Sequence, residues 1–87
     1  MLKNKNHIRV RVRFPAAKKE YECGLAPQGT LKENILLLYR LVQDEISSSW
    51  QMPQEFLVFD GLLNHEYNPN VTVVSNGISD GTILLIL

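Results

Sequence analysis

The stretch that decides the fold is SNGISDGTILLIL, residues 75–87. It contains two turn dipeptides, Asn76-Gly77 and Asp80-Gly81, in which glycine adopts a positive φ without steric cost. The apolar run that follows the second turn is short, and it is bounded in the way typical of a strand buried on both faces. Such a strand needs a neighbour along each edge, because an open apolar edge promotes aggregation. We therefore predict residues 82–87 as the central strand of a sheet.

The N-terminal part of the chain has the period-two pattern of two half-buried strands joined by a turn. A turn at residues 15–18 places Arg13 opposite Glu20 and Arg11 opposite Glu22. Opposite charges directly across two strands stabilise the pair by about 0.2–1 kcal/mol each. The pattern predicts one hairpin with charges on its outer face and, on its inner face, Ile8, Val10, Val12, Phe14, Tyr21, Cys23 and Leu25.

A helix is predicted from the sequence that follows this hairpin. Thr30 and Glu33 have the spacing of a capping box, in which each side chain accepts from the other's backbone N–H. The helix should span about Leu31–Ile46 and end at the serines 47–49. At 100° per residue, one apolar face of this helix contains Leu31, Ile35, Leu38, Tyr39, Val42 and Ile46.

The remainder of the chain predicts shorter elements. Residues 56–59 are expected to form a third strand, and a short edge strand is expected at about 62–67. Residues 71–74 have strand propensity, but the Asn-Gly turn that follows at once favours a connection or a short 3₁₀ turn. Val73 and Ile78 would be the buried anchors of that connection.

Composition limits the function classes. A chain of 87 residues suits one domain, here residues 7–87 after a flexible N-terminus of residues 1–6. Nine basic residues balance nine acidic ones, so net charge attracts neither nucleic acid nor an anionic membrane. The single cysteine cannot form an internal disulfide, which favours the cytoplasm. No signal peptide and no apolar run of membrane-spanning length is recognised.

The predicted order of strands and helix resembles the β-grasp fold of ubiquitin over residues 7–87. The resemblance is carried by three pieces: the capped helix at Thr30, the stretch Leu57-Val58-Phe59-Asp60-Gly61, and the ending Thr72-Val73 … Gly77-Ile78 … Gly81-Thr82-Ile83-Leu84-Leu85. It implies an α+β fold, in which one helix packs on one face of a mixed sheet of four to five strands. The first and last strands would pair in parallel at the sheet centre.

The ending GISDGTILLIL is similar to that of the small bacterial YukD proteins, also called EsaB. They are ubiquitin-like cytosolic components of the type VII (Esx) secretion systems of Gram-positive bacteria. The resemblance implies a cytoplasmic, non-enzymatic accessory protein that binds a protein partner. Ubiquitin and the sulfur carriers end in a flexible Gly-Gly tail, whereas this chain ends at Leu87 within the predicted strand. Conjugation and sulfur transfer are therefore not expected.

Val58, Leu84 and Ile86 are the first candidate partner-binding residues. If their sequence neighbours face the helix, these three point to the opposite face of the sheet. The resemblance implies an interaction site there, because ubiquitin binds partners through an apolar patch on that face and Val58 and Ile86 match its positions. The alternative is ordinary surface apolarity, although three adjoining apolar side chains are less common than one. The partner would be another protein or a second copy of this chain.

Leu37 and Leu41 are the second candidates, because both fall outside the apolar stripe of the helix. They form either an interaction ridge or contacts with the Trp50 loop or residues 62–70.

Three chemical functions are weighed and set aside. Cys23 with His7 or His65 is not expected to act as a nucleophile, because an inward cysteine behaves as a small hydrophobe. The same residues lack zinc-ligand spacing, and no cofactor motif is present. Arg9, Arg11 and Arg13 form a basic stripe, but neighbouring glutamates neutralise it, so nucleic-acid binding is the third hypothesis. The second hypothesis is a tail-less sulfur-carrier-like or regulatory subunit of a metabolic enzyme.

Overall fold

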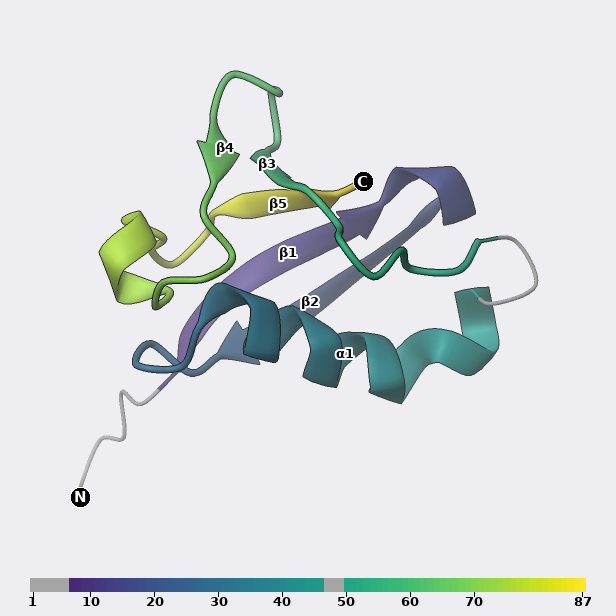
Figure 1. Cartoon of the computed structure of the whole chain (residues 1–87), viewed down its shortest axis with the longest axis horizontal. Coiled ribbons are helices and arrows are strands. Elements are labelled where there is room, and N and C mark those ends of the chain that lie inside the picture. Colours follow the sequence, from purple (N-terminus) through teal and green to yellow (C-terminus); the bar gives the residue numbers. More distant parts are fainter. Residues whose placement is uncertain (1–6, 47–49) are drawn as a thin grey trace.

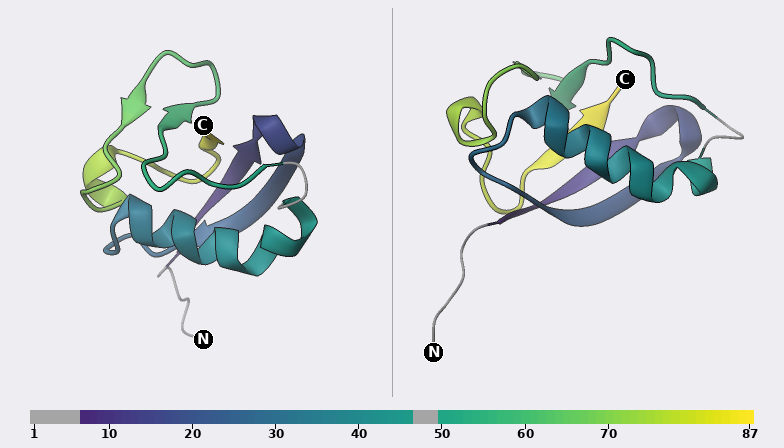
Figure 2. Two further views of the ribbon diagram at one scale, coloured as in Figure 1. Left: turned by 45° about the vertical axis from the view of Figure 1, so that its right-hand side comes forward. Right: turned by 60° about the horizontal axis from the view of Figure 1, so that its bottom comes forward.

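The protein is described by a computed structural model, which covers residues 7–46 and 50–87. The predictions of a flexible N-terminus and of a helix end at the serines lie outside the described residues. Five strands form one mixed sheet in the order β2-β1-β5-β3-β4, and helix α1 packs across one of its faces (Figures 1 and 2). The predicted α+β class is confirmed. No helix in the described part of the chain has the length and apolarity needed to cross a membrane.

The predicted hairpin is confirmed residue by residue. Strands β1 (Ile8–Phe14) and β2 (Lys19–Leu25) pair antiparallel, and the 3₁₀ turn η1 (Pro15–Ala17) joins them. Arg13 lies opposite Glu20 in the ladder and forms an ion pair with it at 2.7 Å. Arg11 lies opposite Glu22, as predicted, but its side chain reaches diagonally to Glu20 at 3.6 Å, while the ion pair of Glu22 is with Arg9. The arginines and glutamates therefore form a connected charged surface on the hairpin.

The predicted central strand is also confirmed. Strand β5 (Ile83–Ile86) pairs in parallel with β1 and antiparallel with β3 (Val58–Asp60), and β4 (Glu66–Tyr67) pairs with the far side of β3. Backbone hydrogen bonds between Leu57 and Leu87 extend the β3–β5 pairing by one step. The two turn glycines before β5 have φ values of +76° and +89°, which is the conformation that the turn dipeptides predict.

Helix α1 (Leu31–Ile46) has the predicted bounds and buries the predicted stripe. The capping box is formed: the Glu33 N–H donates to Thr30 Oγ1 at 3.0 Å, and the Thr30 N–H donates to Glu33 Oε1 at 3.3 Å. The helix also buries Asn34, which the apolar pattern does not predict. Its amide accepts from the Ala26 N–H and donates to the carbonyls of Ala26 and Thr30, so it fastens the β2–α1 connection to the helix.

Replacing Thr30 by alanine is expected to destabilise the protein by about 1 kcal/mol, because the first turn of α1 loses its side-chain acceptor. The measurement is a urea titration followed by circular dichroism. Thr30→Ser keeps the acceptor and is the matched control. An unchanged midpoint for Thr30→Ala, at unchanged slope, would contradict the role assigned to this cap.

The smaller elements also follow the predictions, with two adjustments. Val73 and Ile78 are buried on either side of the 3₁₀ turn η2 (Val74–Asn76), as expected for a connection rather than a strand. The predicted third strand is paired from Val58 onward, and the edge strand is limited to Glu66–Tyr67. Both edges of the predicted ranges belong to the turns that flank these strands.

The predicted face of Val58, Leu84 and Ile86 is wrong, because all three are in the core and are at most 1% exposed. Side chains that lie directly opposite each other in paired strands point to the same face of a sheet. Leu84 is opposite Val12, which faces the helix, and Ile86 is opposite Val58. All three therefore point toward α1, and their sequence neighbours point away from it.

Candidate functional site

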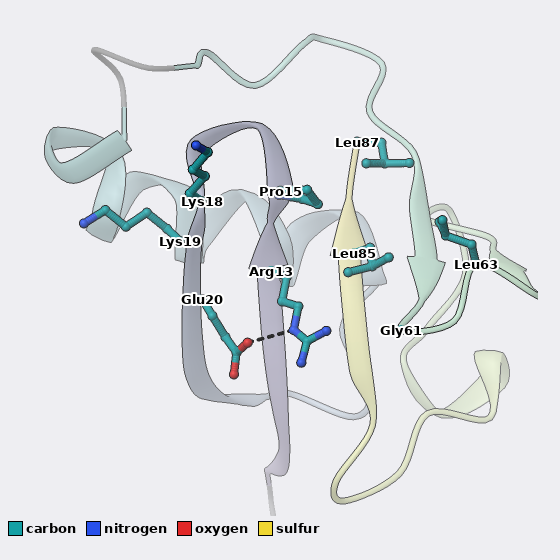
Figure 3. A pocket seen from close by; sticks show the side chains of 9 residues that line it. All are labelled: Arg13, Pro15, Lys18, Lys19, Glu20, Gly61, Leu63, Leu85 and Leu87. Carbon is teal, nitrogen blue, oxygen red and sulfur yellow. Dashed lines mark hydrogen bonds and ion pairs between the residues drawn. The ribbon is translucent and has the colours of Figure 1, made fainter.

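The face of the sheet away from α1, here called the outer face, is the part of the fold that no described helix covers (Figure 3). Its side chains form columns that follow the strand order. In one row, Arg13 of β1 is opposite Leu85 of β5, and Leu85 is opposite Phe59 of β3. In the next row, Arg11 is opposite Ile83. The outer face therefore combines a charged half on β1 and β2 with an apolar half on β5 and β3.

A concave site lies at one end of the outer face, where the charged and apolar halves meet. We call it the outer-face pocket; its volume is about 500 Å³ (Figure 3). Leu85 and Leu87 come from the central strand and Leu63 from the turn after β3. The full lining consists of Arg13, Pro15, Lys18, Lys19, Glu20, Gly61, Leu63, Leu85 and Leu87. The fold thus gathers residues from the η1 turn, the central strand and the β3–β4 turn around one apolar floor.

The side chains around the outer-face pocket are mainly basic. Arg13 is held by Glu20 through a hydrogen-bonded ion pair at 2.7 Å. Within residues 7–46 and 50–87, no carboxylate lies at ion-pair distance from Lys18 or Lys19. Three cationic side chains therefore face one carboxylate around an apolar floor, which favours an apolar ligand that carries negative charge.

Leu63 is the most unusual residue of the outer-face pocket. It has a φ of +60°, and its side chain is 58% exposed. The turn holds this conformation, because the Leu63 N–H donates to the Asp60 carbonyl and the Asn64 N–H donates to Asp60 Oδ1. A branched apolar side chain is unfavourable in the left-handed region, and its exposure adds nothing to the core. Strain of this kind is concentrated at functional sites, so Leu63 marks the pocket as a candidate docking site.

The predicted site residues are not brought together. Val58, Leu84 and Ile86 are under α1, whereas Leu37 and Leu41 are on its solvent side and are 58% and 83% exposed. The predicted contacts of Leu37 and Leu41 with the Trp50 loop or residues 62–70 are not what the structure shows: both line a groove between α1 and β2. The partner-binding role of Leu37 and Leu41 stays a prediction.

The candidate thiol chemistry gains no support from the surroundings of Cys23. Its side chain is partly buried against the core, on the predicted inner face. Burial raises the pKa of the Cys23 thiol above its ordinary value, and the charge of Arg9 offsets part of that shift. The thiol is therefore the favoured form at neutral pH, which lowers its reactivity. His65 packs edge-on against Tyr67 on the other side of the sheet, with ring centroids 4.8 Å apart.

Sequence reasoning missed Leu63, Leu85 and Leu87 as site residues. Leu85 and Leu87 alternate with the buried Ile86, so a correct assignment of the two faces of the central strand would have found them. The positive φ of Leu63 has no signature in the sequence, since leucine is not a residue that predicts a left-handed turn position.

No protein-family model and no curated protein sequence matches the chain. Three solved structures are similar in fold. A de novo designed protein based on ubiquitin has a TM-score of 0.71 at 15% identity, and the match covers 97% of this chain and 90% of that one. The ubiquitin-like domain of the Mycobacterium tuberculosis type VII secretion system protein EccD1 has a TM-score of 0.62 at 11% identity, covering 93% and 97%.

The third structure is the ubiquitin-like domain of an Arabidopsis thaliana protein, with a TM-score of 0.59 at 15% identity; the match covers 94% of this chain and 77% of that one. Because these three matches span most of the chain, the fold is the ubiquitin-like β-grasp fold, as predicted.

Proposed function

We propose that this chain is a non-enzymatic, ubiquitin-like protein-interaction module, and that it serves as a cytoplasmic accessory component of a bacterial type VII (Esx) secretion system. Two observations support the secretion assignment. The ending GISDGTILLIL is similar to that of the YukD/EsaB proteins, and one structure of the same fold is a domain of a type VII secretion protein. The module would bind a cytoplasmic segment of another component of such a system.

The outer-face pocket is the proposed docking site, and Leu63 is the observation that carries this assignment. A side chain that is both strained and exposed is retained more easily if a partner covers it. Leu87 is 42% exposed beside it, whereas the adjoining Leu85 is 8% exposed and forms the floor. An apolar anchor from the partner would fill the pocket, and acidic residues next to that anchor would meet Lys18 and Lys19.

Leu63→Asn is expected to stabilise the protein by about 0.5–1 kcal/mol while it weakens docking, because asparagine tolerates the left-handed conformation better but removes the apolar wall. Leu62→Asn is the matched control, since Leu62 is 78% exposed in the same turn but does not line the pocket. The measurements are a urea titration and surface-plasmon binding to purified cytoplasmic segments of the secretion system's membrane ATPase. A weaker complex with Leu63→Asn alone is the expected result.

The secretion role is tested separately, by deleting the gene in its native host. Export of the Esx substrates should stop, and it should return when the host carries the Leu62→Asn variant but not when it carries Leu63→Asn. Normal export from the deletion strain would refute the secretion assignment. Equal binding and equal rescue by the two variants would refute the pocket as the docking site while leaving the secretion role intact.

A further inference from the structure

Strand β2 forms an edge of the sheet on the side away from β1, and no further strand pairs with it (Figures 1 and 2). Backbone hydrogen bonds to its residues come from the β1 ladder. Outside that ladder, no backbone N–H or carbonyl of residues 19–25 forms a hydrogen bond with any described residue. An edge of this length presents a template on which an extended segment can add a strand.

An apolar groove runs beside this edge. It lies between β2 and α1, its volume is about 250 Å³, and its lining includes Cys23, Leu37, Leu38 and Leu41. Cys23 points into it from the inner face of β2, and Leu41 is the most exposed of the large apolar side chains at 83%. In an added strand every second side chain points to the inner face, so these side chains would enter the groove and contact Leu37 and Leu41.

Charge on the outer face of β2 selects the partner of this edge. The exposed positions there are Glu20 and Glu22, which the arginines of β1 already match from one side. A strand added on the other side is favoured if it places basic residues opposite the same carboxylates. A second copy of β2 would instead bring Glu20 and Glu22 of each copy together, and like charges on neighbouring strands are destabilising. The edge is therefore matched to a basic partner strand rather than to itself.

We propose that the β2 edge and the α1–β2 groove form a second binding site, which takes an extended segment of another protein with alternating basic and apolar residues. Its basic side chains meet Glu20 and Glu22, its apolar side chains meet Leu37 and Leu41, and its backbone pairs with β2. The site is separate from the outer-face pocket: the groove lies on the helix side of the sheet, and neither Leu37 nor Leu41 lines that pocket. Its test does not depend on the proposed secretion role.

The probe is a capped, fluorescently labelled peptide with the sequence IRVRVRF, which is the sequence that already pairs with β2 in the fold. Fluorescence anisotropy should show saturable binding to the intact protein. The matched control peptide, IEVEVEF, keeps the apolar positions and reverses the charges. It should bind at least about tenfold more weakly, because two favourable cross-strand pairs become two repulsive ones.

Two variants locate the site on the protein. Leu41→Ser should weaken binding of IRVRVRF by about tenfold, as truncation of an interface anchor does, without changing the thermal melt. Leu62→Ser is the matched control, because Leu62 is similarly exposed but belongs to the β3–β4 turn. In NMR titrations, the amide signals of residues 19–25 should shift.

Three outcomes would overturn the proposal. They are absence of saturable binding, equal binding of the two peptides, and equal binding of the two variants. Amide shifts concentrated on β5 would also overturn it, since they would show that the peptide displaces β1 from the sheet centre instead of adding beside β2.

Discussion

Val58→Asp and Ile86→Asp are each expected to unfold the protein. The two side chains are directly opposite each other on β3 and β5, under α1, and they are 0% and 1% exposed. An aspartate there is left without a partner in an apolar core, and burying an unpaired charge destabilises by several kcal/mol. Domains of this size have about 5–15 kcal/mol of total stability, so either substitution removes much or all of it.

The control for this prediction is Leu57→Asp, one residue before Val58. Leu57 is on the outer face and is 46% exposed, so the same carboxylate remains in water and the fold should persist. Circular dichroism melts and gel filtration separate the outcomes. Cooperative melting of Val58→Asp near the wild-type temperature would show that the faces of the central strands are assigned incorrectly here.

Phe14→Ala is expected to destabilise the protein by about 3–5 kcal/mol, which is typical of removing a buried aromatic side chain. Phe14 is fully buried at the end of β1. Its ring contacts Tyr21 and Trp50, with centroids 6.1 and 5.7 Å away, so it joins the hairpin to the loop that follows α1. The substitution leaves a cavity where these three elements meet.

Trp50 is the only tryptophan of the chain and contacts Phe14, so its fluorescence reports this site directly. A urea titration followed by tryptophan emission should show a large drop in midpoint for Phe14→Ala. Phe14→Leu retains most of the volume and should lose no more than about 1.5 kcal/mol. Equal midpoints for Phe14→Ala and the wild type would mean that this aromatic cluster contributes nothing to stability.

The hairpin was predictable in detail because three independent features of its sequence agree. Apolar alternation defines the faces, the Arg13–Glu20 and Arg11–Glu22 pairs fix the register, and residues 15–18 have the length of the turn. A shift by one residue would break all three at once. The helix was predictable for the same reason, since its capping box and its apolar stripe agree on where it begins.

The faces of β5 were not predictable in this way, because its residues are apolar on both sides and do not alternate. The missing information is the register against β1. In the structure, Asp80 and Gly81 set that register: Asp80 Oδ1 accepts from the Arg9 N–H, and the Gly81 N–H donates to the Arg9 carbonyl. These contacts join distant parts of the chain, and local sequence patterns do not report them. The outer-face pocket depends on the same register and was missed with it.

The parallel pairing of β1 with β5 also constrains the order of events during biosynthesis. Arg9 and Asp80 are hydrogen-bonded although they are 71 positions apart, so the sheet centre closes only after the final strand has been made. At 5–20 residues per second, translation separates the two strands by roughly 4–14 s. During that interval the hairpin and helix can form from local contacts, but the inner edge of β1 has no partner. The nascent chain therefore passes through a period in which an apolar strand edge is exposed to aggregation and to capture by chaperones.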